Sequence, residues 1–156
     1  MARKKIGLQF DGWEEYIAKL DELGGTQTMK KGVEEALIAS KKHVNPLIEK
    51  AMVKGKLPAK GRYSTGDTKD SIDTDMSVEW EGMTGIIKVG FDFSKSGIKS
   101  ILLMQGTEVN GSPRMKPVSG LKSAIYGAKT QKEVAEIQEK VLSDFIKKVM
   151  EGEGYG

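Results

Sequence analysis

The sequence predicts an α+β fold, with a small antiparallel sheet packed with a long N-terminal-half helix and a C-terminal helix. Apolar residues recur every three or four positions from about 28 to 54 and again from 130 to 149, the spacing of an amphipathic helix. Between 76 and 89 apolar and polar residues alternate, as in a strand with one buried face. The 156 residues have the length of one domain, so we expect a single domain over 1–156.

The N-terminal region begins with a strand pattern and continues as a helix. Ile6, Leu8 and Phe10 alternate with Gly and Gln, which indicates a short strand. From Trp13 to Leu23 the apolar spacing becomes helical, and two glycines then end the pattern.

The long helix, from about Thr28 to Lys54, contains a proline. Pro46 lacks the backbone N–H that would bond to the carbonyl of Lys42. We therefore expect a kink near Lys42 or a break, after which the helix resumes.

The second half of the chain predicts a hairpin and two further helical segments. Alternation over 76–80, a turn at Glu81-Gly82 and apolar residues over 86–89 predict a β-hairpin. Residues 121–126 predict a helical turn. Thr130 is the expected N-cap of the last helix, and Glu133 three residues later would complete a capping box.

Two stretches rich in Gly, Pro, Ser and Lys, residues 55–75 and 105–120, are predicted to be long interaction loops. An apolar run leads into the second loop, and its Leu102, Leu103 and Met104 either bury on both faces or contribute to a partner-binding patch. The tail, 151–156, has no apolar pattern and is expected to fray.

Composition disfavours most enzyme chemistry. The chain has no cysteine and one histidine, so it lacks disulfides, thiolate nucleophiles and two-histidine metal sites. No apolar run approaches the roughly 18 residues of a membrane-spanning helix, and the basic N-terminus is not followed by the apolar stretch of a signal peptide. We expect a soluble protein that is not an enzyme and holds no cofactor or metal.

The formal charge is small but unevenly distributed. The chain has 25 Lys and Arg against 22 Asp and Glu, and this small positive excess is well below that of a typical nucleic-acid-binding protein. Residues 1–62 carry 13 basic and 8 acidic residues, whereas residues 63–156 carry 12 and 14. Such an asymmetry suits head-to-tail self-association, although it also arises by chance.

Individual polar residues give weak signals of catalysis or metal binding. His43 has a side chain suited to acid–base work, but no acidic residue is placed by the pattern to orient it, which favours a surface or boundary histidine. The series Asp67, Asp70, Asp73 and Asp75 lacks the Gly and Glu of an EF-hand, so we expect solvated carboxylates.

A string of basic residues in the first loop is the candidate DNA-facing segment. It consists of Lys54, Lys56, Lys60 and Arg62. These side chains could meet phosphates through salt-dependent contacts, or dock an acidic neighbour. No phosphate-binding glycine loop accompanies them.

Two short motifs in a fixed order carry a resemblance to a known family. A T-G-x-x-x-x-S-I segment follows the long helix, with Thr65, Gly66, Ser71 and Ile72 at its defined positions. An apolar-x-G-T segment precedes a proline-spaced loop, with Gly106, Thr107, Pro113 and Pro117 at the corresponding positions. From about 6 to 149 this order resembles the tail-completion (neck, head–tail connector) proteins of long-tailed bacteriophages.

The resemblance implies a structural virion protein, made in the cytoplasm of the bacterial host and placed in the neck between head and tail. Such a subunit would form a homo-oligomeric ring, hexameric by family resemblance, that joins head-closure proteins to the tail-terminator or tail-tube proteins. Double-stranded DNA would pass through the lumen without sequence-specific binding, and no membrane is involved. The motif residues would then lie at interfaces.

Two alternatives stay open. One is a tail terminator or another minor tail protein, which would share the ring but contact the tube directly. The other is a basic DNA-binding accessory module, which the lysines of the first loop suggest.

Overall fold

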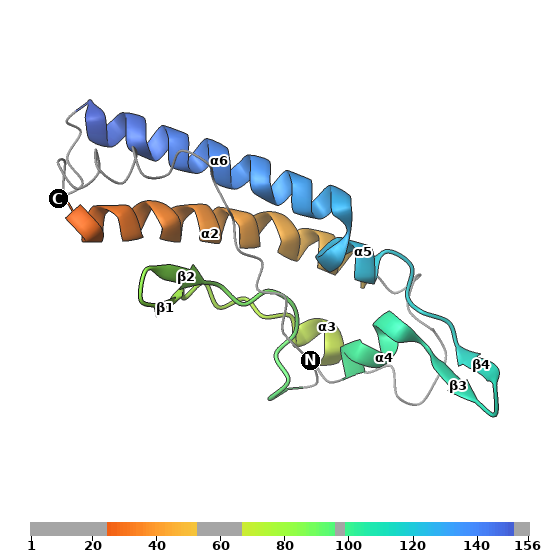
Figure 1. Ribbon diagram of the computed structural model, residues 1–156. Coiled ribbons are helices and arrows are strands. Elements are labelled where there is room, and N and C mark those ends of the chain that lie inside the picture. Colours follow the sequence, from red (N-terminus) through yellow and green to blue (C-terminus); the bar gives the residue numbers. More distant parts are fainter. Residues whose placement is uncertain (1–24, 53–66, 96–98, 152–156) are drawn as a thin grey trace.

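The computed structural model describes residues 25–52, 67–95 and 99–151, and these confirm the α+β fold (Figure 1). The long helix is α2 (Gly25–Ala51) and the C-terminal helix is α6 (Ala128–Met150). Between them come α3 (Asp67–Asp70), β1 (Glu79–Glu81), β2 (Thr84–Ile86), α4 (Lys99–Gln105), β3 (Thr107–Val109), β4 (Ser112–Met115) and α5 (Leu121–Tyr126). The strand expected at 6–10, the helix expected at 13–23, residues 53–66 and the tail beyond 151 lie outside the described residues.

Helices α2 and α6 lie side by side (Figure 1). Gly32 makes their close approach possible, because a Cβ added there would lie 2.7 Å from Cδ1 of Phe145, which is 2% exposed. The aromatic ring therefore packs directly on the backbone of α2. Burial of such a ring is among the largest apolar contributions that one residue can make.

Helix α2 continues through Pro46 as one element, so the alternative of a break at this position is wrong. Val44 and Ile48, on either side of the proline, are buried in the core. Their packing offsets the loss of the one backbone hydrogen bond that proline removes.

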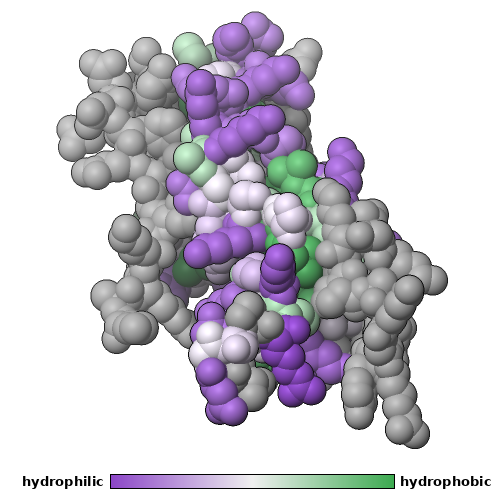
Figure 2. Space-filling model, turned by 90° about the vertical axis from the view of Figure 1, so that its right-hand side faces the viewer, coloured by the Kyte–Doolittle hydropathy of each residue, from purple (hydrophilic) through white to green (hydrophobic). Residues whose placement is uncertain are grey.

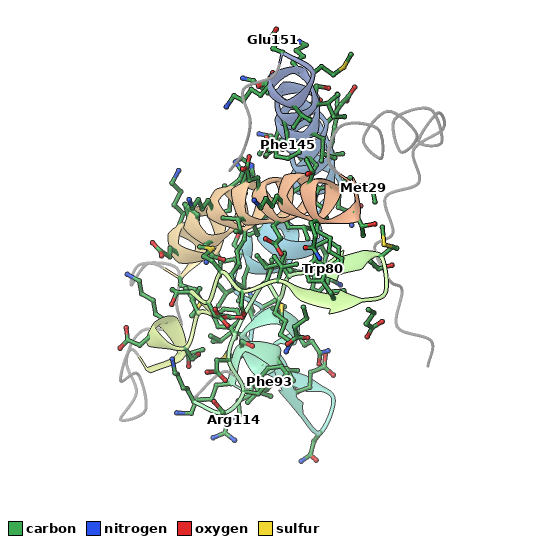
Figure 3. The ribbon with its side chains drawn as sticks, turned by 90° about the vertical axis from the view of Figure 1, so that its left-hand side faces the viewer. Met29, Trp80, Phe93, Arg114, Phe145 and Glu151 are labelled. Carbon is green, nitrogen blue, oxygen red and sulfur yellow. The ribbon has the colours of Figure 1, made fainter. Side chains whose placement is uncertain are left out.

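The hairpin predicted between 76 and 89 is confirmed, with shorter strands than expected. Strand β1 pairs antiparallel with β2 across a two-residue turn whose first residue, Gly82, has a φ of 64°. Gly85 lets β2 approach α2, because a Cβ there would lie 3.0 Å from Cδ1 of Leu37. Opposite Gly85, Trp80 donates its ring N–H to Glu34 Oε1 at 2.9 Å. The hairpin is thereby fixed on the surface of α2 (Figure 3).

The hydrophobic core lies at the C-terminal end of α2, where three separate segments of the chain meet. Its buried members are Val44, Ile48, Ala51, Met52, Ile72, Val118, Leu121 and Ala124. Partly buried side chains from α4, α5 and α6 pack around them.

Residues 105–120, expected to be a long interaction loop, contain a second β-hairpin. Strand β3 pairs antiparallel with β4, with a bulge after Thr107. The turn residues Asn110 and Gly111 have φ values of 52° and 76°, as a type I′ turn requires. The expectation followed the overall Gly and Pro content and overlooked Asn-Gly, the strongest short-range hairpin signal in a sequence.

The corner between α5 and α6 replaces the expected capping box. Helix α6 begins at Ala128, so Thr130 lies inside its first turn and is not the N-cap. The Thr130 hydroxyl donates to the carbonyl of Ser123 at 3.0 Å, and the Gly127 N–H donates to the same carbonyl at 2.9 Å. A Cβ at Gly127 would lie 2.3 Å from that oxygen, so only glycine fits there.

Candidate functional site

The β3–β4 hairpin, residues 107–115, projects from one end of the molecule and is called the arm below (Figure 1). The face at this end is largely hydrophilic, with a smaller group of hydrophobic side chains among the polar ones (Figure 2). Arg114 lies on the arm, far from Trp80 and α2 (Figure 3). The arm therefore lies away from α2 and from the β1–β2 hairpin that packs on it.

The chain enters and leaves the arm through residues that touch each other. The Gly106 N–H donates to Leu102 O at 2.8 Å, which ends α4, and the φ of Gly106 is 76°. A Cβ at Gly106 would lie 2.5 Å from the Met115 carbonyl oxygen and 3.0 Å from Cδ of Pro117. Glycine is thus required at the root of the arm for both its backbone conformation and its lack of a side chain.

The apolar run that precedes the arm is divided between core and surface. It forms helix α4, in which Leu103 and Met104 pack against the core, while Leu102 is 50% exposed. The N–H of Val118 donates to Leu103 O at 2.7 Å, which attaches the far side of the arm to the same helix. Of the three residues predicted for a patch, only Leu102 is mainly available on the surface.

Ser71 and Ile72, the described part of the first motif, are buried inside the subunit. The Ser71 hydroxyl donates to Thr68 O at 2.7 Å, and the Ser71 carbonyl accepts the Asp92 N–H at 2.7 Å. Ile72 forms a β-bridge with Phe91 and belongs to the core. In this conformation they hold the subunit together from inside, and their place at an interface, which the resemblance implies, stays a prediction.

The second motif builds the arm and its root. Gly106 and Pro117 touch at the root, Thr107 pairs with Met115, and Pro113 pairs with Glu108. Ile72 of the first motif and Val118, the residue after Pro117, belong to the same hydrophobic core. The remaining predicted residues, Thr65, Gly66, Lys54, Lys56, Lys60 and Arg62, lie outside the described residues.

A fully buried lysine ties α2 to the segment that follows α3. Lys41, 0% exposed, donates to the carbonyl of Asp75 and lies 3.2 Å from Asp73 Oδ2. One turn further on, Asn45 donates to Asp73 O at 3.1 Å. The sequence placed Lys41 in the helix but did not predict its burial, because the partners are more than 25 positions away.

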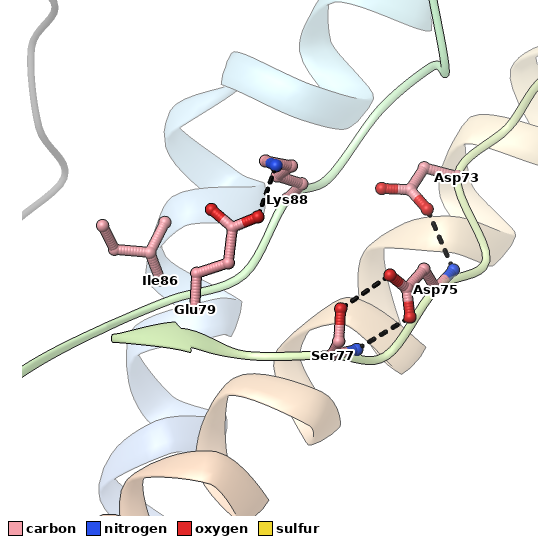
Figure 4. A pocket seen from close by; sticks show the side chains of 6 residues that line it. All are labelled: Asp73, Asp75, Ser77, Glu79, Ile86 and Lys88. Carbon is pink, nitrogen blue, oxygen red and sulfur yellow. Dashed lines mark hydrogen bonds and ion pairs between the residues drawn. The ribbon is translucent and has the colours of Figure 1, made fainter. Parts of the chain in front are cut away.

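The same segment borders a small polar pocket lined by Asp73, Asp75, Ser77, Glu79, Ile86 and Lys88 (Figure 4). Asp75 accepts the Ser77 hydroxyl at 2.6 Å and the Ser77 N–H at 3.0 Å, and these bonds hold its pKa below the usual value. The Lys88 ammonium donates to Glu79 at 2.5 Å, which raises the pKa of Lys88. With about 30 Å³ of space, the pocket has room for about one water molecule and not for a substrate.

His43 does have an acidic partner, contrary to the expectation from its own helix. Its Nε2 lies 3.0 Å from Glu133 Oε2 on α6, and both side chains are 33% exposed. The histidine contact holds the pKa of Glu133 below its usual value. The pair therefore links α2 to α6, and the carboxylate is 90 positions away in the chain, where a local pattern could not show it.

Within the described ranges, no three His, Cys, Asp or Glu side chains gather closely enough to hold a metal ion. No helix in those ranges is long and apolar enough to span a membrane. A comparison of the chain with models of known families, with curated proteins and with solved structures finds no match.

Proposed function

We propose that this chain is a tail-completion or neck subunit of a tailed bacteriophage, a structural protein that forms a ring between head-closure proteins and the tail tube. The observation that supports this most is the position of the two motifs. Ile72 of the first motif lies in the same hydrophobic core as Val118, and Gly106 and Pro117 of the second motif form the root of an arm that projects from an α+β body.

A ring subunit needs a rigid body and a part that reaches its neighbours. Helices α2 and α6 and the core supply the body, since interiors packed in this way deform little. The arm supplies the reach, and its type I′ turn fixes its shape before any partner arrives. Heterologous contacts between such subunits close into a ring when the rotation allows. Double-stranded DNA would pass through the lumen.

The test is cryo-electron microscopy of purified particles of the phage that encodes this chain. The proposal predicts a neck ring whose subunit density contains the α2–α6 pair and the arm. Density at the end of the tube itself, in contact with tube subunits, would favour a tail terminator or minor tail protein. Absence from the particle would overturn the virion proposal.

A DNA-binding accessory module is the alternative from a different functional class, and the basic residues at 54–62 are the only observation that suggests it. It predicts duplex affinity that falls steeply with added salt, because bound counterions are released from the phosphates. Fluorescence anisotropy with a labelled duplex, in the chain and in a variant with all four basic residues replaced by Gln, distinguishes it. Binding that is absent, or equal in the two proteins, removes this alternative.

A further inference from the structure

We infer that Asn110, in the turn of the arm, is a site of spontaneous modification, at which the chain converts this asparagine to aspartate or isoaspartate without an enzyme (Figure 1). The inference rests on the structure of the arm and on the chemistry of an Asn-Gly pair, so it holds whether or not the chain forms a ring. The fold also sets the rate, because the closed turn keeps the reacting atoms apart.

The reaction joins two groups that are adjacent in the sequence. The backbone nitrogen of Gly111 loses its proton to hydroxide and attacks Cγ of the Asn110 side chain. The new N–C bond closes a five-membered succinimide, and the side-chain amide leaves as ammonia. Water then opens the ring at one of its two carbonyl groups and returns a proton to the Gly111 nitrogen. Opening at one carbonyl gives aspartate, and opening at the other gives isoaspartate, so one water is consumed for each ammonia released.

Both reacting residues are open to solvent. Asn110 and Gly111 are exposed, and the pair Val109 and Ser112 closes the strand ladder next to them. The Gly111 N–H therefore lies outside the ladder, as in any two-residue hairpin turn. A Cβ added at Gly111 would have no other described atom within 4 Å, apart from those of its chain neighbours. Hydroxide and water can therefore reach the nitrogen and the side-chain amide.

The closed turn holds the nitrogen and Cγ apart. The φ values of Asn110 and Gly111, 52° and 76°, are those of a type I′ turn, in which ψ of the first central residue is also positive. A small positive ψ turns the next backbone nitrogen away from the side chain, whereas the succinimide needs both on the same side of the Cα–C bond. The ring can therefore close only after the turn has opened, and local opening limits the rate.

Asn45, the other asparagine of the chain, cannot react in this way. It is followed by Pro46, whose nitrogen has no proton to lose. Asn45 is also 7% exposed, and its side-chain amide donates to Asp73 O at 3.1 Å. The chain therefore contains one reactive and one inert asparagine, and the inert one is an internal control.

Both products alter the end of the arm. Each places a new carboxylate in the turn, two positions from Glu108. Isoaspartate also adds one methylene to the backbone, which lengthens a connection that the type I′ geometry restricts to two residues. The modified arm therefore differs from the original in charge and in shape.

Peptide mass spectrometry after incubation of the full chain at neutral and at mildly alkaline pH tests the inference. Proteolysis at mildly acidic pH stops the reaction during digestion, and electron-transfer fragmentation distinguishes isoaspartate from aspartate. We expect both products at Asn110, faster at the higher pH, and none at Asn45. In urea the rate at Asn110 should be at least about tenfold higher than in the folded chain, because the turn is then open.

Two glycine variants test the role of the arm without changing the reacting pair. Gly106→Ala loosens the root, because its Cβ would lie 2.5 Å from the Met115 carbonyl oxygen, and should raise the rate at Asn110 toward that in urea. Gly82→Ala makes the same change at a positive-φ glycine of the β1–β2 hairpin and should leave the rate unchanged. Absence of product at Asn110 in the folded chain, equal rates with and without urea, or equal effects of the two variants would each overturn the inference.

Discussion

Gly32 carries a large share of the α2–α6 contact although it has no side chain. Its Cα lies where the ring of Phe145 packs, and an added methyl group would lie 2.7 Å from Cδ1. We expect Gly32→Ala to destabilise the chain by about 1–3 kcal/mol despite the higher helix propensity of alanine. Chemical denaturation measures this, with Lys31→Ala, an exposed neighbour on the same helix, as the control. A Gly32→Ala variant as stable as the control would contradict the packing described.

Lys41 is the second residue whose removal should be costly. Lys41→Met keeps the length and removes the donors to Asp73 and to the Asp75 carbonyl. We expect a loss of about 2–3 kcal/mol, at the low end for a broken ion pair, because Asp73 is 21% exposed and water can reach it. Denaturation with urea gives the value, and Lys42→Met, exposed on the same helix, should change it little.

The His43–Glu133 pair makes stability depend on pH in a defined direction. Since the pKa of Glu133 is lowered by folding, its stabilising contribution is present above the ordinary value of 4.5 and is lost as the pH falls through the folded value. We expect the difference in Tm between the chain and Glu133→Gln to shrink as the pH is lowered below about 4.5. Thermal unfolding monitored by circular dichroism across that range checks this, and a difference that grows on acidification would contradict the assignment.

At the scale of the element, the arm is defined by its turn. Asn110 has a φ of 52°, which asparagine tolerates and a β-branched residue does not. We expect Asn110→Val to raise the exchange rates of the arm amides by roughly tenfold or more, equivalent to about 1–3 kcal/mol of local strain. The rates in α2 and α6 should stay unchanged. Hydrogen exchange measured by NMR separates the two, and Asn110→Gly, which accepts positive φ, is the control.

The sequence predicted elements best where the pattern was long or strictly periodic. Helices α2 and α6 follow from the spacing of apolar residues, and the β1–β2 hairpin follows from the alternation together with the turn at Glu81-Gly82. The arm was missed because the many Gly and Pro residues of this stretch were taken to indicate a loop, and the Asn110-Gly111 turn signal between its two short strands was overlooked. The start of α6 was misplaced because Thr130 was taken for an N-cap. Its hydroxyl instead donates a hydrogen bond to a carbonyl of the preceding helix, whereas the side chain of an N-cap accepts one from a backbone N–H of its own helix.

The candidate site was predictable in part. Gly106 and Pro117 could be named in advance because glycine and proline mark backbone requirements in any sequence. The burial of Ser71 and the pairing of His43 with Glu133 could not, because both depend on which distant segments the fold brings together. A pattern along the chain contains no information on such contacts until the topology is known.

At the scale of the whole molecule, body and arm should be separable. Gly106 and Pro117 lie in contact, so a short Gly-Ser linker in place of 107–116 can close the gap at little entropic cost. We expect this variant to keep the Tm of the parent within a few degrees, since the core contains no residue of the arm. It should lose self-association in sedimentation velocity. A variant that no longer folds would show that the arm belongs to the body.

The carbonyl oxygen of Ser123, which accepts two hydrogen bonds, has a mechanical consequence for the subunit. Its carbonyl is bonded by both Gly127 and Thr130, so α5 and α6 meet in a stiff joint and not in a hinge. Leu121 of α5 is fully buried in the core at the base of the arm, next to Val118. A load that pulls on the arm of one copy is therefore transmitted through α5 to the full length of α6, and the subunit behaves as a lever whose two ends turn together.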